Sequence, residues 1–270
     1  MMNITDEVQA LILDMDGVLW RADSPIGDLP AAFASLERKG YAALLATNNS
    51  TRTVDQYLDT LANLGVFLEP WQIVTSSEAV GDYLQAKYPQ GGPVYVVGED
   101  GLLDAMRRRG FYIDTHQALA VVAGMDRQVT YQKIAVANRL IRSGALYIGT
   151  NPDKTFPTPD GLIPGAGAII IAIAAAAGVE PLILGKPKPY LYQLGLQRLG
   201  LQPEQVLVVG DRLDTDIAGA QEIGCRTALV LSGVTSQADA QAWQPPPDWI
   251  GADLTTLVAQ LPTRKPWKNP

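Results

Sequence analysis

The sequence predicts an α/β fold with a parallel-sheet core and a second α/β unit inserted into it. Short uncharged apolar runs, each followed at once by polar residues, recur along the chain, as expected for buried parallel strands. Helical periodicity follows several of these runs. The stretch Pro89-Gln90-Gly91-Gly92-Pro93 has the composition of a linker, and a new alternation of strands and helices begins after it. A length of 270 residues allows one large domain or two unequal ones.

The first apolar run, Leu11-Ile12-Leu13, leads directly into Asp14-Met15-Asp16-Gly17. Residues i and i+2 of an extended segment point to the same side, so Asp14 and Asp16 could converge on one ligand. Gly17 would let the backbone turn close beside them. The alternative is an ordinary turn at a polar strand end. Because ligands of open α/β sheets bind outside the strand C-termini, we expect the site here.

The next elements are a helix over 28–40 and a strand over 41–46, which ends in the polar cluster Thr47-Asn48-Asn49-Ser50-Thr51. Such hydroxyl and amide groups can cap the following helix, expected over 54–65, or bind phosphate. Both interpretations can hold together.

The inserted unit is expected to follow a helix that runs through Tyr88. Its predicted elements are a strand over 94–97, a helix over 100–109, a strand over 119–123, a helix over 130–143 and a strand over 146–149. Arg107, Arg108 and Arg109 lie at a predicted helix C-terminus, where cations are favourable, and we expect them to be solvated. The uncharged segment 161–179 is rich in Ala and Gly and is interrupted by Pro164, which favours a buried helix over a membrane span.

Two further apolar runs end in polar chemistry. Leu182-Ile183-Leu184 is followed by Gly185-Lys186-Pro187, and Val206-Leu207-Val208-Val209 by Gly210-Asp211-Arg212-Leu213-Asp214-Thr215-Asp216. Taken singly, these could be a surface lysine and a helix cap. An acid pair, a hydroxyl cluster, a lysine and a second acid cluster together are the groups needed to transfer a phosphoryl group with Mg²⁺.

Net charge and the counts of histidine and cysteine limit the kinds of partner and site that we expect. A net charge of -7 makes binding to nucleic-acid phosphates unfavourable. His116 is the only histidine, which excludes a site with two protein histidines, and we expect it at the surface. With Cys225 as the only cysteine and no apolar leader before the first strand, we expect a cytoplasmic enzyme that contacts neither membrane nor nucleic acid. A monomer and a homo-oligomer both remain open.

The order DMDG, TNNST, GKP, GDRLDTDI resembles the four motifs of the haloacid dehalogenase superfamily. VVAGMDRQVTY at 121–131 and TNPDKTFPT at 150–158, followed by PGAGAI, resemble its type IIA subgroup of para-nitrophenyl phosphatases, phosphoglycolate phosphatases and NagD-like phosphatases. The resemblance implies a Rossmann-like parallel-sheet core at 1–80 and 182–270, with an α/β cap domain at 81–181.

Carried over by motif, Asp14 would be the nucleophile that forms an aspartyl-phosphate. Asp16 would protonate the leaving alcohol and then activate water. The resemblance further implies Mg²⁺ held by Asp14, the backbone carbonyl of Asp16 and Asp211, with Asp216 in the outer shell.

The same resemblance gives roles to residues outside the acid clusters. Thr47 and the amide of Asn48 would hold the phosphoryl group, and Lys186 would offset the negative charge of Asp14 and the phosphate. Asn151 and Asp153 could contact the leaving group, or could simply form an Asn-Pro-Asp turn.

These roles predict an enzyme acting on a small phosphorylated metabolite, with phosphoglycolate, para-nitrophenyl phosphate, sugar phosphates and nucleoside monophosphates as candidates. Asp16 favours phosphate esters over haloacids, because dehalogenase-like members of the family lack this second acid. The alternative class is a non-catalytic, receiver-like phosphate-binding or phosphoacceptor module. The inserted unit and Asp16 argue against it, because a receiver needs neither a large insertion nor an acid for a leaving group.

Overall fold

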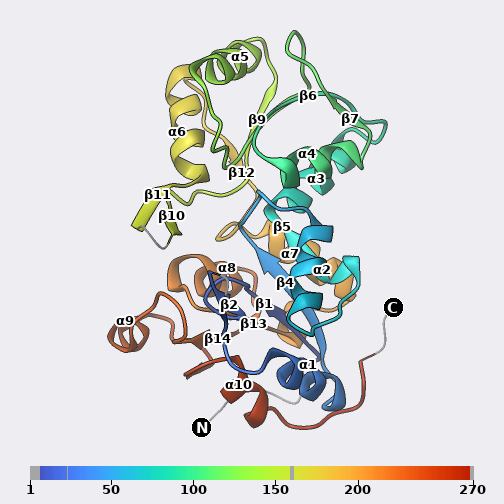
Figure 1. The fold of residues 1–270 in the computed structure, drawn as a ribbon, viewed down its shortest axis with the longest axis vertical. Coiled ribbons are helices and arrows are strands. Elements are labelled where there is room, and N and C mark those ends of the chain that lie inside the picture. Colours follow the sequence, from blue (N-terminus) through green and yellow to red (C-terminus); the bar gives the residue numbers. More distant parts are fainter. Residues whose placement is uncertain (1–6, 23, 159–160, 268–270) are drawn as a thin grey trace. The chain divides into compact units, whose positions relative to one another are not determined.

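The computed structural model describes residues 7–22, 24–158 and 161–267, and divides the chain into two compact units (Figure 1). The core unit comprises Met1–Thr47, Tyr57–Val74 and Pro189–Pro270. The inserted unit comprises Asn48–Gln56 and Thr75–Lys188. The inserted unit therefore reaches beyond the cap expected at 81–181, whose boundaries stay a prediction.

The core unit is built on a six-stranded sheet with the order β15-β14-β13-β1-β4-β5. Strand β1 pairs in parallel with β13 on one side and with β4 on the other. The strands are β1 (Ala10–Leu13), β4 (Ala42–Thr47), β5 (Ile73–Thr75), β13 (Val206–Gly210), β14 (Arg226–Val230) and β15 (Trp249–Gly251). This arrangement confirms the predicted parallel-sheet core.

The register of the central strands decides where the polar residues lie. Leu13 is aligned with both Val209 and Leu45, and the Asp14 N–H donates to the Val209 carbonyl at 2.8 Å. Strands β1, β4 and β13 are buried along their whole length, as their uncharged sequences require. Their carboxyl ends therefore meet at one edge of the sheet.

Helices surround this sheet, and a short hairpin, β2 (Trp20–Arg21) with β3 (Ser24–Pro25), follows β1. The core helices are α1 (Leu29–Arg38), α2 (Val54–Asn63), α7 (Tyr190–Leu199), α8 (Ala218–Glu222), α9 (Gln237–Ala242) and α10 (Leu254–Gln260), with the first residues of α2 assigned to the inserted unit. The Asp28 side chain caps α1 by accepting from the Ala31 N–H at 3.0 Å.

The inserted unit has its own five-stranded sheet with the order β12-β9-β8-β6-β7, in which every pair is parallel. Its strands are β6 (Gly92–Val97), β7 (Phe111–Ile113), β8 (Ala120–Ala123), β9 (Leu146–Gly149) and β12 (Leu182–Ile183). Strands β10 (Thr155–Thr158) and β11 (Gly161–Pro164) form a separate antiparallel hairpin. Because β12 pairs with β9, the strand before Lys186 belongs to the inserted sheet.

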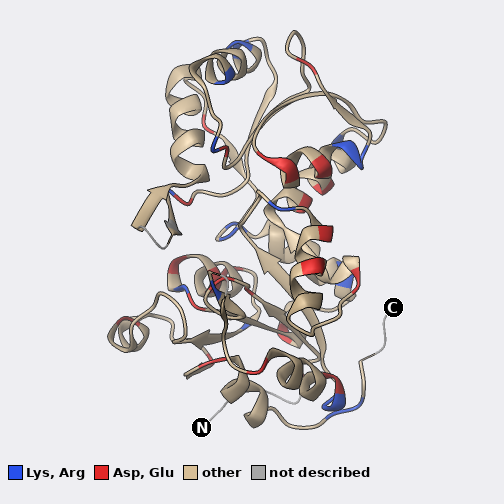
Figure 2. Cartoon of the chain, in the orientation of Figure 1, with Lys and Arg blue, Asp and Glu red and all other residues tan. Residues whose placement is uncertain are grey.

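Among the residues described, the helices of the inserted unit are α3 (Ser76–Lys87), α4 (Asp100–Arg107), α5 (Tyr131–Arg142) and α6 (Ala166–Ala177). Helix α6 carries no charged residue and is uniformly tan in Figure 2. Ile169, Ile170 and Ile173 bury their side chains in a cluster shared with α5, so the buried helix expected near Pro164 is found. No helix among the described residues has both the length and the hydropathy to span a membrane.

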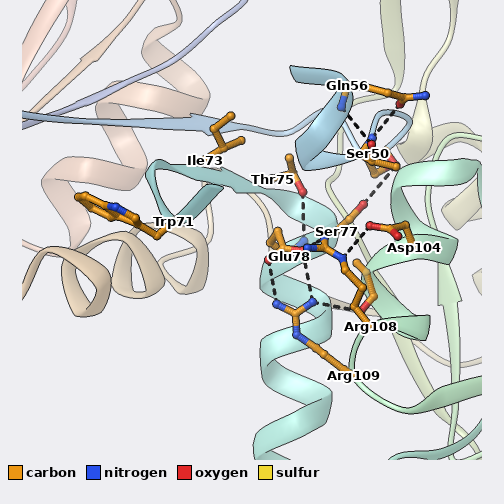
Figure 3. Close-up of polar contacts among 12 residues, drawn as sticks. Ser50, Gln56, Trp71, Ile73, Thr75, Ser77, Glu78, Asp104, Arg108 and Arg109 are labelled. Carbon is orange, nitrogen blue, oxygen red and sulfur yellow. Dashed lines mark hydrogen bonds and ion pairs between the residues drawn. The ribbon is translucent and has the colours of Figure 1, made fainter. Parts of the chain in front are cut away.

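The arginines at the end of α4 correct one expectation, because two of them are paired rather than simply solvated. Arg109 Nη2 lies 2.8 Å from Glu78 Oε2, and Arg108 Nη2 lies 2.7 Å from Glu78 Oε1 (Figure 3). The Glu78 side chain, in the first turn of α3, is only 6% exposed. A buried carboxylate needs such partners, and the pairs tie α3 to α4.

Glu78→Gln should destabilise the protein, because it leaves the Arg109 guanidinium without its charge partner. We expect the free energy of unfolding, measured by urea denaturation, to fall by about 2–4 kcal/mol. The matched control is Glu99→Gln, which breaks the more exposed pair of Glu99 with Arg127, and should cost less than about 1 kcal/mol. Equal losses in the two variants would show that burial gives the Glu78 pairs no special weight.

Candidate functional site

Three aspartates meet at the carboxyl edge of the core sheet. Ligand oxygens of Asp14, Asp211 and Asp216 all lie within 4.8 Å of one another. All three residues are buried, with Asp14 9%, Asp211 2% and Asp216 1% exposed. The cluster joins two of the strand ends that the sequence singled out.

Each aspartate is placed by the element that precedes it. Asp14 follows β1, and Asp211 follows β13 in the neighbouring position. Asp216 lies in a π-helical turn over Leu213–Ile217, where its Oδ2 accepts from the Arg212 N–H at 3.1 Å. The Tyr192 hydroxyl, from α7, donates to the Asp216 carbonyl at 3.2 Å. The turn thereby brings Asp216 back toward the strand end that carries Asp211.

The loop after β14 holds Asp211, and the sequence analysis did not identify it. The Val234 N–H donates to Asp211 Oδ2 at 2.7 Å, and the Thr235 hydroxyl donates to the Asp211 carbonyl at 2.6 Å. The Ser232 hydroxyl donates to the Gly17 carbonyl at 2.6 Å, which joins this loop to the turn after Asp14. A signal was present, because the apolar run 228–231 ends in Ser-Gly, the same pattern as the other strand ends.

Three glycines leave room for the carboxylates. A Cβ on Gly17 would lie 2.5 Å from Asp211 Oδ2, and one on Gly210 would lie 2.5 Å from Asp216 Oδ2. A Cβ on Gly233 would overlap Asp211 Oδ2 outright. The backbone at Gly17 also has φ +82°, which favours glycine.

The donor set fits a hard divalent cation. Three crowded carboxylates repel one another when ionised, and a cation between them removes that repulsion. Mg²⁺ takes oxygen ligands at short range, and the described residues offer them here in buried positions. Asp16 differs from the three, because its side chain is exposed and its Oδ1 accepts from Trp20 Nε1 at 3.0 Å.

The predicted residues in the inserted unit form a second cluster. Asn48 Nδ2 donates to the Lys186 carbonyl and to Asp153 Oδ2, both at 3.0 Å. Asn151 Nδ2 donates to the Asn48 carbonyl at 2.7 Å, and Asn151 Oδ1 accepts from the Asp153 N–H at 3.1 Å. The last bond is that of an Asn-Pro-Asp turn, and a contact of Asn151 or Asp153 with substrate stays a prediction.

The structure also shows where Thr47 and His116 lie. Thr47 is the last residue of β4 in the core unit and is 2% exposed. His116 is exposed in the inserted unit, as expected.

Comparison with known proteins agrees with these features. The family model described as haloacid dehalogenase-like hydrolase matches residues 11–112, and one described as "HAD-hyrolase-like" matches residues 183–257. An acid sugar phosphatase of Staphylococcus aureus is 36% identical, over 94% of this chain and 98% of that protein.

Solved structures of phosphatases are similar to this chain over most of its length. A p-nitrophenyl phosphatase from Archaeoglobus fulgidus aligns with a TM-score of 0.89 and 33% identity, covering 94% of this chain and 99% of that one. A glycerol phosphate phosphatase from Mycobacterium tuberculosis, solved in complex with magnesium, aligns with a TM-score of 0.85 and 33% identity, covering 93% and 76%. The resemblance carried by the four motifs is thus confirmed, and the chain belongs to the haloacid dehalogenase-like hydrolases.

Proposed function

We propose that this protein is a Mg²⁺-dependent phosphatase that hydrolyses small phosphate monoesters through an aspartyl-phosphate on Asp14. The observation that carries the proposal is the cluster of three buried carboxylates, two at adjoining strand ends and one in the following π-helical turn, in a chain of a hydrolase family. The receiver-like alternative has no comparable support, because the related proteins carry phosphatase names.

In the proposed reaction, a carboxylate oxygen of Asp14 attacks phosphorus while the bond to the ester oxygen breaks. Asp16 gives its proton to the departing alcohol. Asp16 then takes a proton from water, the water oxygen attacks the same phosphorus, and inorganic phosphate leaves Asp14 as a free carboxylate. The exposed side chain of Asp16 suits this exchange of protons.

Asp14, the backbone carbonyl of Asp16 and Asp211 would hold the Mg²⁺, with Asp216 supporting them from the outer shell. When bound, the ion would supply positive charge that lets an anionic phosphate approach the carboxylates. The hydrogen bonds from Val234 and Thr235 fix Asp211 for this task.

The remaining roles complete the proposal. Thr47 and the backbone N–H of Asn48 bind the phosphoryl group, and Lys186 balances negative charge during the transfer. Asn151 and Asp153 are assigned to the leaving group. The names of the relatives favour sugar phosphates, glycerol phosphate and nitrophenyl phosphate as substrates to test first. A cytoplasmic location and the absence of nucleic-acid or membrane partners belong to the same proposal.

The direct test is to incubate purified protein with a panel of phosphate esters and to measure the inorganic phosphate released, with and without EDTA. We expect Mg²⁺-dependent turnover of several small esters. Asp14→Asn should lower kcat by about 10³-fold or more, because an amide cannot act as the nucleophile. The control is Asp214→Asn, the same change at an exposed aspartate of the neighbouring turn, and should leave the rate within about twofold. Turnover of Asp14→Asn within about tenfold of wild type would exclude the covalent role.

Gly233→Ala should weaken Mg²⁺ binding, because the added methyl group takes the space of the Asp211 carboxylate. We expect the Mg²⁺ dissociation constant, measured by calorimetry, to rise by about 10–100-fold. Gly195→Ala in α7 is the matched control, since its methyl group meets only the ends of flexible side chains, Ile12 Cδ1 at 3.0 Å and Leu44 Cδ2 at 3.5 Å. Unchanged Mg²⁺ affinity in a folded Gly233→Ala protein would place the cation elsewhere.

A further inference from the structure

The Asn48 side chain makes two hydrogen bonds with the main chain of Lys186. Asn48 Oδ1 accepts from the Lys186 N–H at 2.8 Å, and Asn48 Nδ2 donates to the Lys186 carbonyl at 3.0 Å. The carboxamide therefore pairs with one residue as a neighbouring strand would, although the two positions lie 138 residues apart in the chain.

Only one orientation of this carboxamide satisfies its surroundings. Reversing it would set a donor against the Lys186 N–H and an acceptor against the Lys186 carbonyl and Asp153 Oδ2. In the orientation observed, both hydrogens of Nδ2 are used, one by Lys186 and one by Asp153. The polar atoms of the Asn48 side chain are thus all hydrogen-bonded within the protein. The role in phosphate binding proposed for Asn48 needs only its backbone N–H.

Neighbouring groups on both sides hold the Asn48 side chain and Lys186 in place. The Asn48 carbonyl accepts from Asn151 Nδ2 at 2.7 Å and from the Ser76 hydroxyl at 2.6 Å, which anchors the segment that carries the carboxamide. On the other side, a Cβ on Gly185 would lie 2.6 Å from Asn48 Oδ1, so glycine before Lys186 is what allows the approach. Lys186 itself is only 3% exposed.

We infer that the Asn48 side chain is a positioning residue for Lys186. By fixing both main-chain polar groups of Lys186, it sets the origin and direction of the lysine side chain, and it holds the Asp153 carboxylate through the same amide. This inference rests on the proposed function, because it gives Lys186 a task in catalysis. Its consequence is that, with an activated ester such as para-nitrophenyl phosphate, whose leaving group needs little help from Asp153, Asn48 contributes to the rate through Lys186 and not through a contact of its own side chain with substrate.

A double-mutant cycle tests this dependence. The variants are Asn48→Ala, Lys186→Met and the two combined, each assayed for kcat and KM with para-nitrophenyl phosphate. In the wild-type background, Asn48→Ala should lower kcat by about 100-fold, the scale expected when a catalytic group is misplaced by about 1 Å. KM should change by less than about threefold, because the backbone N–H of Asn48 remains. In the Lys186→Met background, the same change should alter kcat by less than about twofold.

Ser77→Ala is the matched control for a loosened loop. The Ser77 hydroxyl donates to the Ser50 carbonyl at 3.1 Å, a contact with the same segment that does not involve Lys186 (Figure 3). It should leave kcat within about twofold of wild type. If Asn48→Ala does not fold, Asn48→Asp replaces it in the cycle, since the carboxylate keeps the shape and the acceptor but removes the donor.

Two results would overturn the inference: a full rate in the Asn48 variant, or an equal loss from the Asn48 change with and without Lys186. An inactive wild-type protein, or a fully active Lys186→Met variant, would contradict the proposed function itself, and these outcomes are distinct from failure of the cycle.

Discussion

The close approach of the buried carboxylates of Asp14, Asp211 and Asp216 is the constraint around which the carboxyl edge of the core sheet is built. With ligand oxygens within 4.8 Å of one another, each ionised pair repels by at least about 3 kcal/mol at an effective dielectric constant of about 20. The fold nevertheless keeps all three buried. Parallel strands bring Asp14 and Asp211 together, the π-helical turn returns Asp216 to them, and Gly233 leaves room for their oxygens. Such an arrangement is understandable when a cation completes it.

The inserted unit contains a second organising centre, the segment after β4. Asn48–Gln56 packs with the inserted unit, although Thr47, the residue just before it, ends a core strand. Asn48 binds the main chain of Lys186, and the Ser50 carbonyl accepts from Ser77. The chain thus passes directly from a buried core strand into a network that holds a lysine of the third motif. The polar cluster that follows β4 is used for structure as well as for the proposed chemistry.

The sequence predicted the central strands, several of the helices and the approach of acidic residues at strand ends, because short uncharged runs ending in acids and helical periodicity depend on local pattern alone. Features that depend on tertiary contacts were missed. The run 107–109 looked like a solvated helix end, yet the carboxylate of Glu78, 31 residues before Arg109, pairs with it. The loop at Ser232–Thr235 carries no charge to mark it, since it supports Asp211 through the Val234 N–H and the Thr235 hydroxyl. The pairing of β12 with β9, which fixes the sheet of the Lys186 segment, likewise needs long-range contacts.

The most direct measurement of the central claim is the stability of the metal-free protein with and without Mg²⁺, for wild type and Asp14→Asn. If the buried carboxylates repel one another when no cation is bound, removing the charge of Asp14 should raise the unfolding temperature of the metal-free protein. Mg²⁺ should then stabilise the wild type more than the variant, because stabilisation by a ligand follows its affinity for the folded state. A metal-free Asp14→Asn protein that is less stable than wild type, and that gains as much from Mg²⁺, would contradict the account.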